Sequence, residues 1–126
     1  MKRRLVAAFL AAHAIAHLAG FAWPWWLMES APYAEPSPNG AMFSGDTAMA
    51  VMSSLWLVAA AAFMVAGLAV LDHWRACRRI TTAAALGSLV LCLLSWPGSL
   101  LGIPINIAIL IALRQTRRPA WQVARA

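Results

Sequence analysis

The sequence predicts an all-α integral membrane protein, a four-helix bundle whose two termini face the cytoplasm. Of its 126 residues, 63% are hydrophobic and 11% are charged, whereas about 25% of the residues of a soluble domain are charged. The apolar residues form four long runs, and all ten basic residues fall in three clusters beside these runs. Because such clusters set the orientation of membrane helices, the net charge of +6 predicts topology rather than a nucleic-acid partner.

Four segments are expected to span the bilayer, since crossing about 30 Å of hydrocarbon takes roughly 20 helical residues. The predicted spans cover residues 5–26, 47–71, 80–96 and 98–114 of a single domain, 1–126. The fourth run is the shortest, and we expect its helix to begin near Pro97, because a proline in the first turn has no hydrogen bond to lose. Pro104 then falls inside the helix and is expected to kink it.

The three basic clusters place the N-terminus, the middle loop and the C-terminus on the cytoplasmic side, where short loops carry an excess of Lys and Arg. The clusters are Lys2, Arg3 and Arg4; Arg75, Arg78 and Arg79; and Arg114, Arg117, Arg118 and Arg125. The opposite side receives the outer loop 27–46, which has three acidic residues and no basic one. Tryptophans near both predicted membrane boundaries agree with this topology.

The first predicted span also has features of a secretory signal peptide, namely a basic start, an apolar run and small residues at Ala12, Ala14 and Ala16. However, the apolar run continues to Trp26, beyond the roughly 7–15 residues of a signal-peptide core. We therefore expect a retained span, with removal of residues 1–16 as the alternative.

Polar residues inside the predicted spans are the main candidates for a functional site, because each costs free energy in the bilayer unless it is paired or hydrated. His13 and His17 are four residues apart, so they share one face of the first helix. A neutral imidazole has one donor and one acceptor, and both need partners. By depth, the partners expected around a small pocket that opens outward are Ser53, Ser54, Ser95 and Asn106.

This predicted polar group has more than one interpretation. It can hold the helices together through hydrogen bonds of about 0.6–2 kcal/mol each, or it can bind a small ligand, a quinone, a lipid headgroup or a proton. Haem or metal binding by His13 and His17 is a further alternative. A metal site needs three or four ligands, and no carboxylate lies at their depth. We therefore predict no metal centre and no catalytic residue.

The first span also carries small residues at every fourth position: Ala8, Ala12, Ala16 and Gly20. Such a ridge lets another helix backbone approach closely. From it we predict that the protein acts non-enzymatically by association in the lipid bilayer, as a homo-oligomer or as an accessory subunit of a larger membrane complex. The alternative is binding of a small ligand, quinone, haem or metal by the two histidines.

Proton-coupled drug export and hydrolysis have no support in the sequence. Small four-span multidrug transporters rely on a glutamate in the first span, where this chain has only two histidines. No nucleophile, base and orienting acid occur at compatible depths. Cys77 and Cys92 are about 20 Å apart along a helix, so we expect no disulfide between them.

The segment 13–21, HAIAHLAGF, which follows the run RLV at 4–6, resembles the first helix of small bacterial membrane proteins with the pattern HxxxHLxGF. The segment 102–106, GIPIN, resembles the start of their last helix. This resemblance implies a bacterial origin, a four-span layout and a place in the cytoplasmic (inner) membrane. That group has no assigned activity, so no catalytic residue is carried over. By size and topology alone the chain also resembles the DoxX group of four-span proteins.

Overall fold

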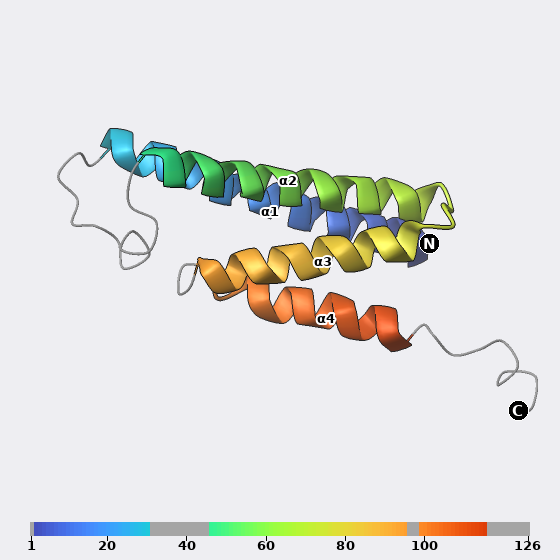
Figure 1. The fold of residues 1–126 in the computed structure, drawn as a ribbon. Helices are drawn as coiled ribbons and strands as arrows, with labels where there is room; N and C mark the ends of the chain where they lie inside the picture. The colour runs from blue at the N-terminus through green and yellow to red at the C-terminus, as the bar shows by residue number, and fades with distance from the viewer. Residues whose placement is uncertain (1, 31–45, 96–98, 116–126) are drawn as a thin grey trace, which may run out of the picture.

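The computed structural model describes residues 2–30, 46–95 and 99–115, which form four α-helices with no strand among them (Figure 1). The helices are α1 (Lys2–Ser30), α2 (Asp46–Leu71), α3 (Cys77–Leu94) and α4 (Gly102–Gln115). Alanine and leucine are frequent in their sequences, and both have high helix propensity. The all-α prediction is therefore confirmed for the described part of the chain.

Three of these helices are long and apolar enough to cross a membrane. The candidate spans are Arg3–Ala22, Ala50–Leu71 and Cys77–Leu94. They correspond to the first three predicted spans and indicate a multi-pass membrane protein. The fourth helix is apolar but has only 14 residues, so its role as a span stays a prediction.

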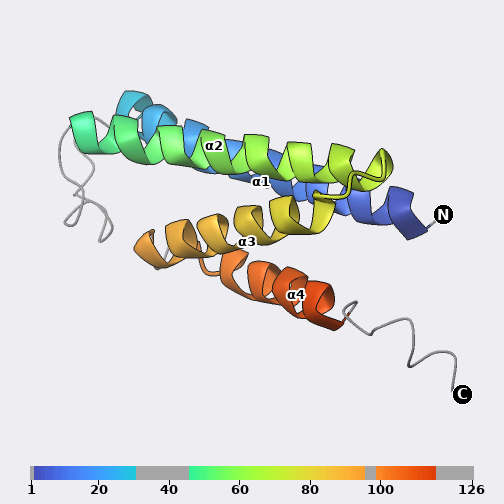
Figure 2. The same cartoon turned by 45° about the vertical axis from the view of Figure 1, so that its right-hand side comes forward.

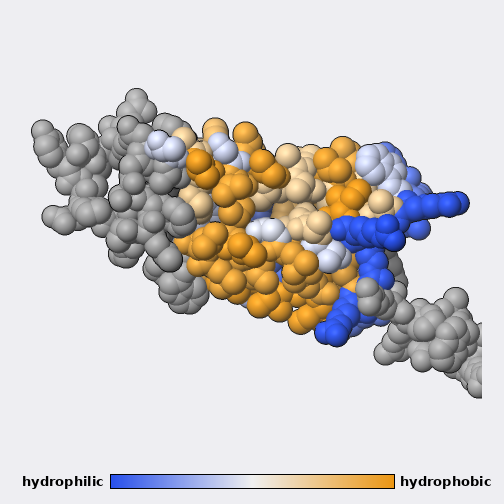
Figure 3. Space-filling model, in the orientation of Figure 1, coloured by the Kyte–Doolittle hydropathy of each residue, from blue (hydrophilic) through white to orange (hydrophobic). Residues whose placement is uncertain are grey.

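Consecutive helices run antiparallel and pack side by side, α1 on α2, α2 on α3 and α3 on α4 (Figures 1 and 2). The start of α1, the turn between α2 and α3, and the end of α4 therefore lie at the same end of the bundle (Figure 1). Hydrophilic side chains gather at this end, and apolar side chains cover the middle of the visible face (Figure 3). The described members of the three basic clusters thus share one end, as the predicted topology requires.

The helix boundaries differ from the predicted spans at several ends. The first helix extends to Ser30, so residues 27–30, which were assigned to the outer loop, are helical. The third helix begins at Cys77 and includes two arginines of the middle cluster. Both differences have the same cause, because a helix can continue through polar residues after its apolar run has ended. Residues 31–45 of the predicted loop lie outside the described part.

The start of α4 corrects a prediction. The helix begins at Gly102 rather than near residue 98, and residues 99–101 form a turn in which the Gly102 N–H donates to the Ser99 carbonyl at 3.0 Å. Pro104 is therefore the third residue of the helix. N–H groups of the first turn have no partner within the helix, so Pro104 removes no hydrogen bond. The predicted kink at Pro104 is wrong for this reason.

The main core contains side chains from all four helices. Its buried members include Leu10 and Ala14 of α1, Phe63 and Ala66 of α2, Ala84 and Ala85 of α3, and Ile109 of α4. A second, smaller core around Trp56 and Leu91 joins α2 to α3. The described helices therefore form a bundle around a shared interior, and the two histidines of α1 face this interior.

Candidate functional site: a buried polar cluster

The inward face of α1 carries both histidines. Its buried residues are Ala7, Leu10, His13, Ala14 and His17, and their spacing of three and four places them on one side of a helix. His13 is 6% exposed and His17 is 4% exposed. The sequence prediction that the two imidazoles share a face holds in the structure, and that face points into the bundle.

Aromatic side chains of α2 enclose the two imidazole rings. The His13 ring centroid lies 4.6 Å from that of Phe63 in an edge-to-face arrangement. The His17 centroid lies 5.2 Å from Trp56 and 5.4 Å from Phe63. The two imidazole centroids are 4.5 Å apart. Contacts of this kind hold the rings in fixed positions, so their nitrogen atoms have few choices of partner.

A chain of hydrogen bonds connects His17 to the other side of the bundle. The side-chain amide of Asn106 donates to Oγ of Ser88 at 2.8 Å, and Oγ of Ser88 lies 2.8 Å from Nε2 of His17. Because the Ser88 oxygen accepts from Asn106, its own proton can be donated to Nε2 of a His17 tautomer protonated on Nδ1. These hydrogen bonds join α4 to α3 and α3 to α1. They therefore connect α1 and α4, two helices that do not pack directly against each other.

Asn106 is also tied to its own helix. Its Nδ2 donates to the Gly102 carbonyl at 2.8 Å and lies 3.8 Å from the sulfur atom of Cys92. The residue is fully buried. Asn106 therefore lies at the centre of the site, and we refer to His13, His17, Ser88 and Asn106 as the polar cluster.

Three buried polar atoms of the described residues have no hydrogen-bond partner: Nε2 of His13, Oδ1 of Asn106 and Oγ of Ser53. The first two belong to the polar cluster and are chemically complementary, since an imidazole N–H can donate to an amide oxygen. Buried polar groups without a partner are uncommon and costly. The cluster therefore has capacity for one further hydrogen bond, and the side chains of His13 and Asn106 are close enough to interact with each other.

The predicted site residues separate into two groups. His13, His17 and Asn106 come together in the polar cluster. Ser53 is buried but forms no hydrogen bond. The hydroxyl of Ser54 is exposed and donates to the carbonyl of Ala50 at 2.7 Å, and Ser95 is the half-buried C-cap residue that follows α3. Neither Ser54 nor Ser95 is hydrogen-bonded to the cluster.

Sequence reasoning missed Ser88 as a member of the site. The prediction selected polar residues in the outer half of the bilayer, and Ser88 lies one helical turn before Cys92 in the middle of α3. A usable signal was present, because Ser88, Cys92 and the buried Ala84 and Ala85 share a face of this helix. A small polar residue on a face of buried small residues is well placed for a contact between helices.

The predicted ridge of α1 is divided in the structure. Ala8, Ala12 and Ala16 are exposed beside the face that carries the histidines, and we call these three residues the outer alanine face. Gly20 instead packs inside the bundle, where a Cβ atom would lie 2.8 Å from Cδ2 of the Trp56 ring. The four small residues therefore have two different environments.

Metal-ligating side chains are sparse around the histidines. Within the described ranges, no group of three or more His, Cys, Asp and Glu residues lies close enough to hold a metal ion. Cys77 and Cys92 are both free thiols. The polar cluster itself offers imidazole, hydroxyl and amide groups, all of which can form hydrogen bonds. Comparison with known proteins adds no further assignment, because the chain matches no protein family, no curated protein and no solved structure.

Proposed function

We propose that this chain is a multi-pass protein of the bacterial cytoplasmic membrane that acts non-enzymatically by association, as a homo-oligomer or as a subunit of a larger membrane complex. In this proposal both termini are cytoplasmic, and the polar cluster holds the helices of one subunit together. The outer alanine face contacts a helix of the partner. The described basic residues lie at or beside the helix ends that meet at one end of the bundle (Figure 1), which supports the orientation.

The observation that carries the proposal is the contrast between the exposed sides of α1 and α2. On α1 the exposed residues include five alanines, Ala8, Ala12, Ala16, Ala19 and Ala22, beside bulky residues such as Phe9 and Ile15. On α2 they are mostly bulky, for example Leu57 and Val58, and Val58 is 64% exposed. Lipid tails solvate bulky apolar side chains as well as another helix does, whereas small residues favour close packing between helices. The row of exposed alanines on α1 therefore has the composition of a helix contact.

The test is a double substitution on the outer alanine face, Ala12→Leu with Ala16→Leu. The added side chains would keep a partner helix at a distance, and we expect the dissociation constant of the oligomer to rise by at least tenfold, or about 1.4 kcal/mol. Sedimentation equilibrium in mild detergent measures this constant. Because these alanines are exposed, the stability of the subunit should not change.

Ala108→Leu with Ala112→Leu is the matched control, since these alanines have the same spacing and are exposed on α4. This pair should leave association unchanged. The proposal is wrong if the unsubstituted protein is a monomer and purifies without partner proteins, or if both double variants associate as the natural sequence does.

A second candidate function is the binding of a small polar ligand or a quinone by the polar cluster. The observation that favours it is the pair of unpartnered atoms, Nε2 of His13 and Oδ1 of Asn106. Mass spectrometry of small molecules that co-purify in mild detergent tests it. A ligand lost on His13→Leu with His17→Leu would support the candidate, and a Soret band lost with the same changes would identify haem.

A further inference from the structure

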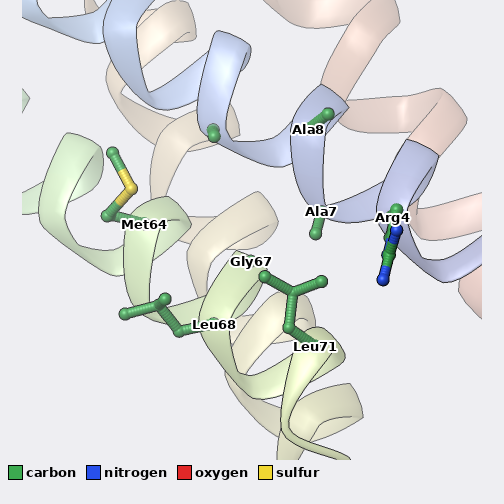
Figure 4. A pocket seen from close by; sticks show the side chains of 8 residues that line it. Arg4, Ala7, Ala8, Met64, Gly67, Leu68 and Leu71 are labelled. Carbon is green, nitrogen blue, oxygen red and sulfur yellow. The ribbon is translucent and has the colours of Figure 1, made fainter.

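A groove of about 390 Å³ lies between α1 and α2, near the start of α1 and the end of α2 (Figure 4). Small side chains of α1 line one wall, among them Ala7, Ala8 and Ala11, and Met64 and Leu68 of α2 belong to the other. Arg4 is its one charged lining residue. The volume is within the range of sites that hold small molecules.

The groove exists because the two helices meet closely beside it while few side chains are available to fill it. A Cβ atom at Gly67 would lie 3.3 Å from the carbonyl oxygen of Ala7, so the backbones are close at this point. From Arg4 to Ala11 the helix rises about 10 Å. The groove therefore has a charged group at the end of the bundle and an apolar wall that continues toward its middle.

The electrostatic surroundings of Arg4 favour an anion. Six described arginines lie at or beside the helix ends that meet at this end of the bundle: Arg3, Arg4, Arg75, Arg78, Arg79 and Arg114. Asp72 is the one acidic residue whose side chain the structure describes, and Arg4 forms no ion pair with it. The guanidinium of Arg4 is thus available to an external partner.

We propose that this groove binds one anionic phospholipid, with its phosphate on the guanidinium of Arg4 and an acyl chain along Ala7, Ala8, Ala11, Met64 and Leu68. A phospholipid has its phosphate at the bilayer surface and its acyl chains in the hydrocarbon. The groove has the same order, with Arg4 at the end of the bundle and the apolar wall toward its middle. Basic pockets between helices are known to take anionic lipid headgroups, and a guanidinium makes strong charge-assisted hydrogen bonds to phosphate. Ala8 also belongs to the outer alanine face, but Ala12 and Ala16, which the association test substitutes, do not line the groove; the two proposals can therefore be tested separately.

The experiment is native mass spectrometry of the purified full chain in mild detergent, titrated with phosphatidylglycerol or with phosphatidylcholine of the same acyl chains. We expect tighter binding of one phosphatidylglycerol. Arg4→Gln should weaken this binding about fivefold. Arg3→Gln is the matched control, because it removes the same charge one residue away and does not line the groove; its effect should be less than twofold.

A second variant, Ala11→Phe, fills the apolar wall and should weaken the binding of both lipids. Its control is Ala83→Phe, which adds the same ring at an exposed position of α3. Circular dichroism checks that each variant is folded. Equal losses in Arg4→Gln and Arg3→Gln would overturn the proposal, since they would indicate general attraction to a basic surface. It would also be overturned if Ala11→Phe left lipid adducts intact and weakened self-association of the chain, because the occupant would then be a second copy.

Discussion

Two faces of α1, the inward face with the histidines and the outer alanine face, belong to the same helix but have different environments. The inward face places His13 and His17 against aromatic rings and a hydrogen-bonded serine, and both imidazoles are almost fully buried. The outer alanine face, about 100° around the helix from the histidines, is exposed along its length. The difference shows that one helix can be held in the bundle by polar contacts on one face and still expose small residues on another.

Gly20 shows where the boundary between these faces lies. It continues the four-residue spacing of the outer alanine face, yet it touches Trp56 of α2. An α-helix advances 100° per residue, so a strict spacing of four drifts around the helix by about 40° at each step. Three steps from Ala8 therefore carry the row from the exposed side to the edge of the interior.

The largest effect is expected for Phe63→Ala, which would break the inward face. Phe63 is fully buried and contacts both imidazole rings, so its removal leaves a cavity beside them. We expect a loss of about 3 kcal/mol in the free energy of unfolding, measured by titration from mild detergent into dodecyl sulfate. Val58→Ala, on the exposed side of the same helix, is the control and should cost less than about 1 kcal/mol.

Gly20→Leu should sharpen the boundary between the two faces. The new side chain would collide with the Trp56 ring, and overpacking of this kind costs about 1–3 kcal/mol. The same titration measures the loss. Gly87→Leu on α3, where a Cβ atom meets nothing within 4 Å, should be close to neutral. If the two variants had equal stability, Gly20 would belong with the outer alanine face after all.

The smallest effect is expected for Ser88→Ala, which removes the link between His17 and Asn106. Hydrogen bonds between helices in a membrane contribute about 0.6–2 kcal/mol, and we expect a loss of about 1 kcal/mol. Ser54→Ala removes a hydroxyl that bonds only to its own helix and should change stability by less than about 0.5 kcal/mol. A loss from Ser54→Ala as large as that from Ser88→Ala would contradict the assignment of Ser88 to the polar cluster.

Much of the helical layout was predictable because apolar runs and basic clusters depend only on composition along the chain. The second helix, for example, runs from Asp46 to Leu71, almost as the predicted span 47–71. The burial of His13, His17 and Asn106 followed from the cost of polar groups in a membrane. The cytoplasmic orientation of the two termini, the location of the protein in a bilayer and the identity of a partner remain predictions.

What the sequence could not specify depends on how helices rotate and end. The role of Ser88 required knowledge of which face of α3 meets α1, and periodicity does not give the relative rotation of two helices. The position of Pro104 depended on where α4 begins. A turn at residues 99–101 decides this, although Leu100 and Leu101 are as apolar as the helix that follows.

The short fourth helix has a consequence for the lipid around the protein. Its 14 residues rise about 21 Å, against about 39 Å for the 26 residues of α2, while the hydrocarbon layer is about 30 Å thick. If both cross one bilayer, the layer must become thinner beside α4, and each ångström of mismatch costs a fraction of a kcal/mol. Leu101, which is 80% exposed just before the helix, extends the apolar surface and reduces this cost. The protein would then impose a gradient of bilayer thickness across its own width.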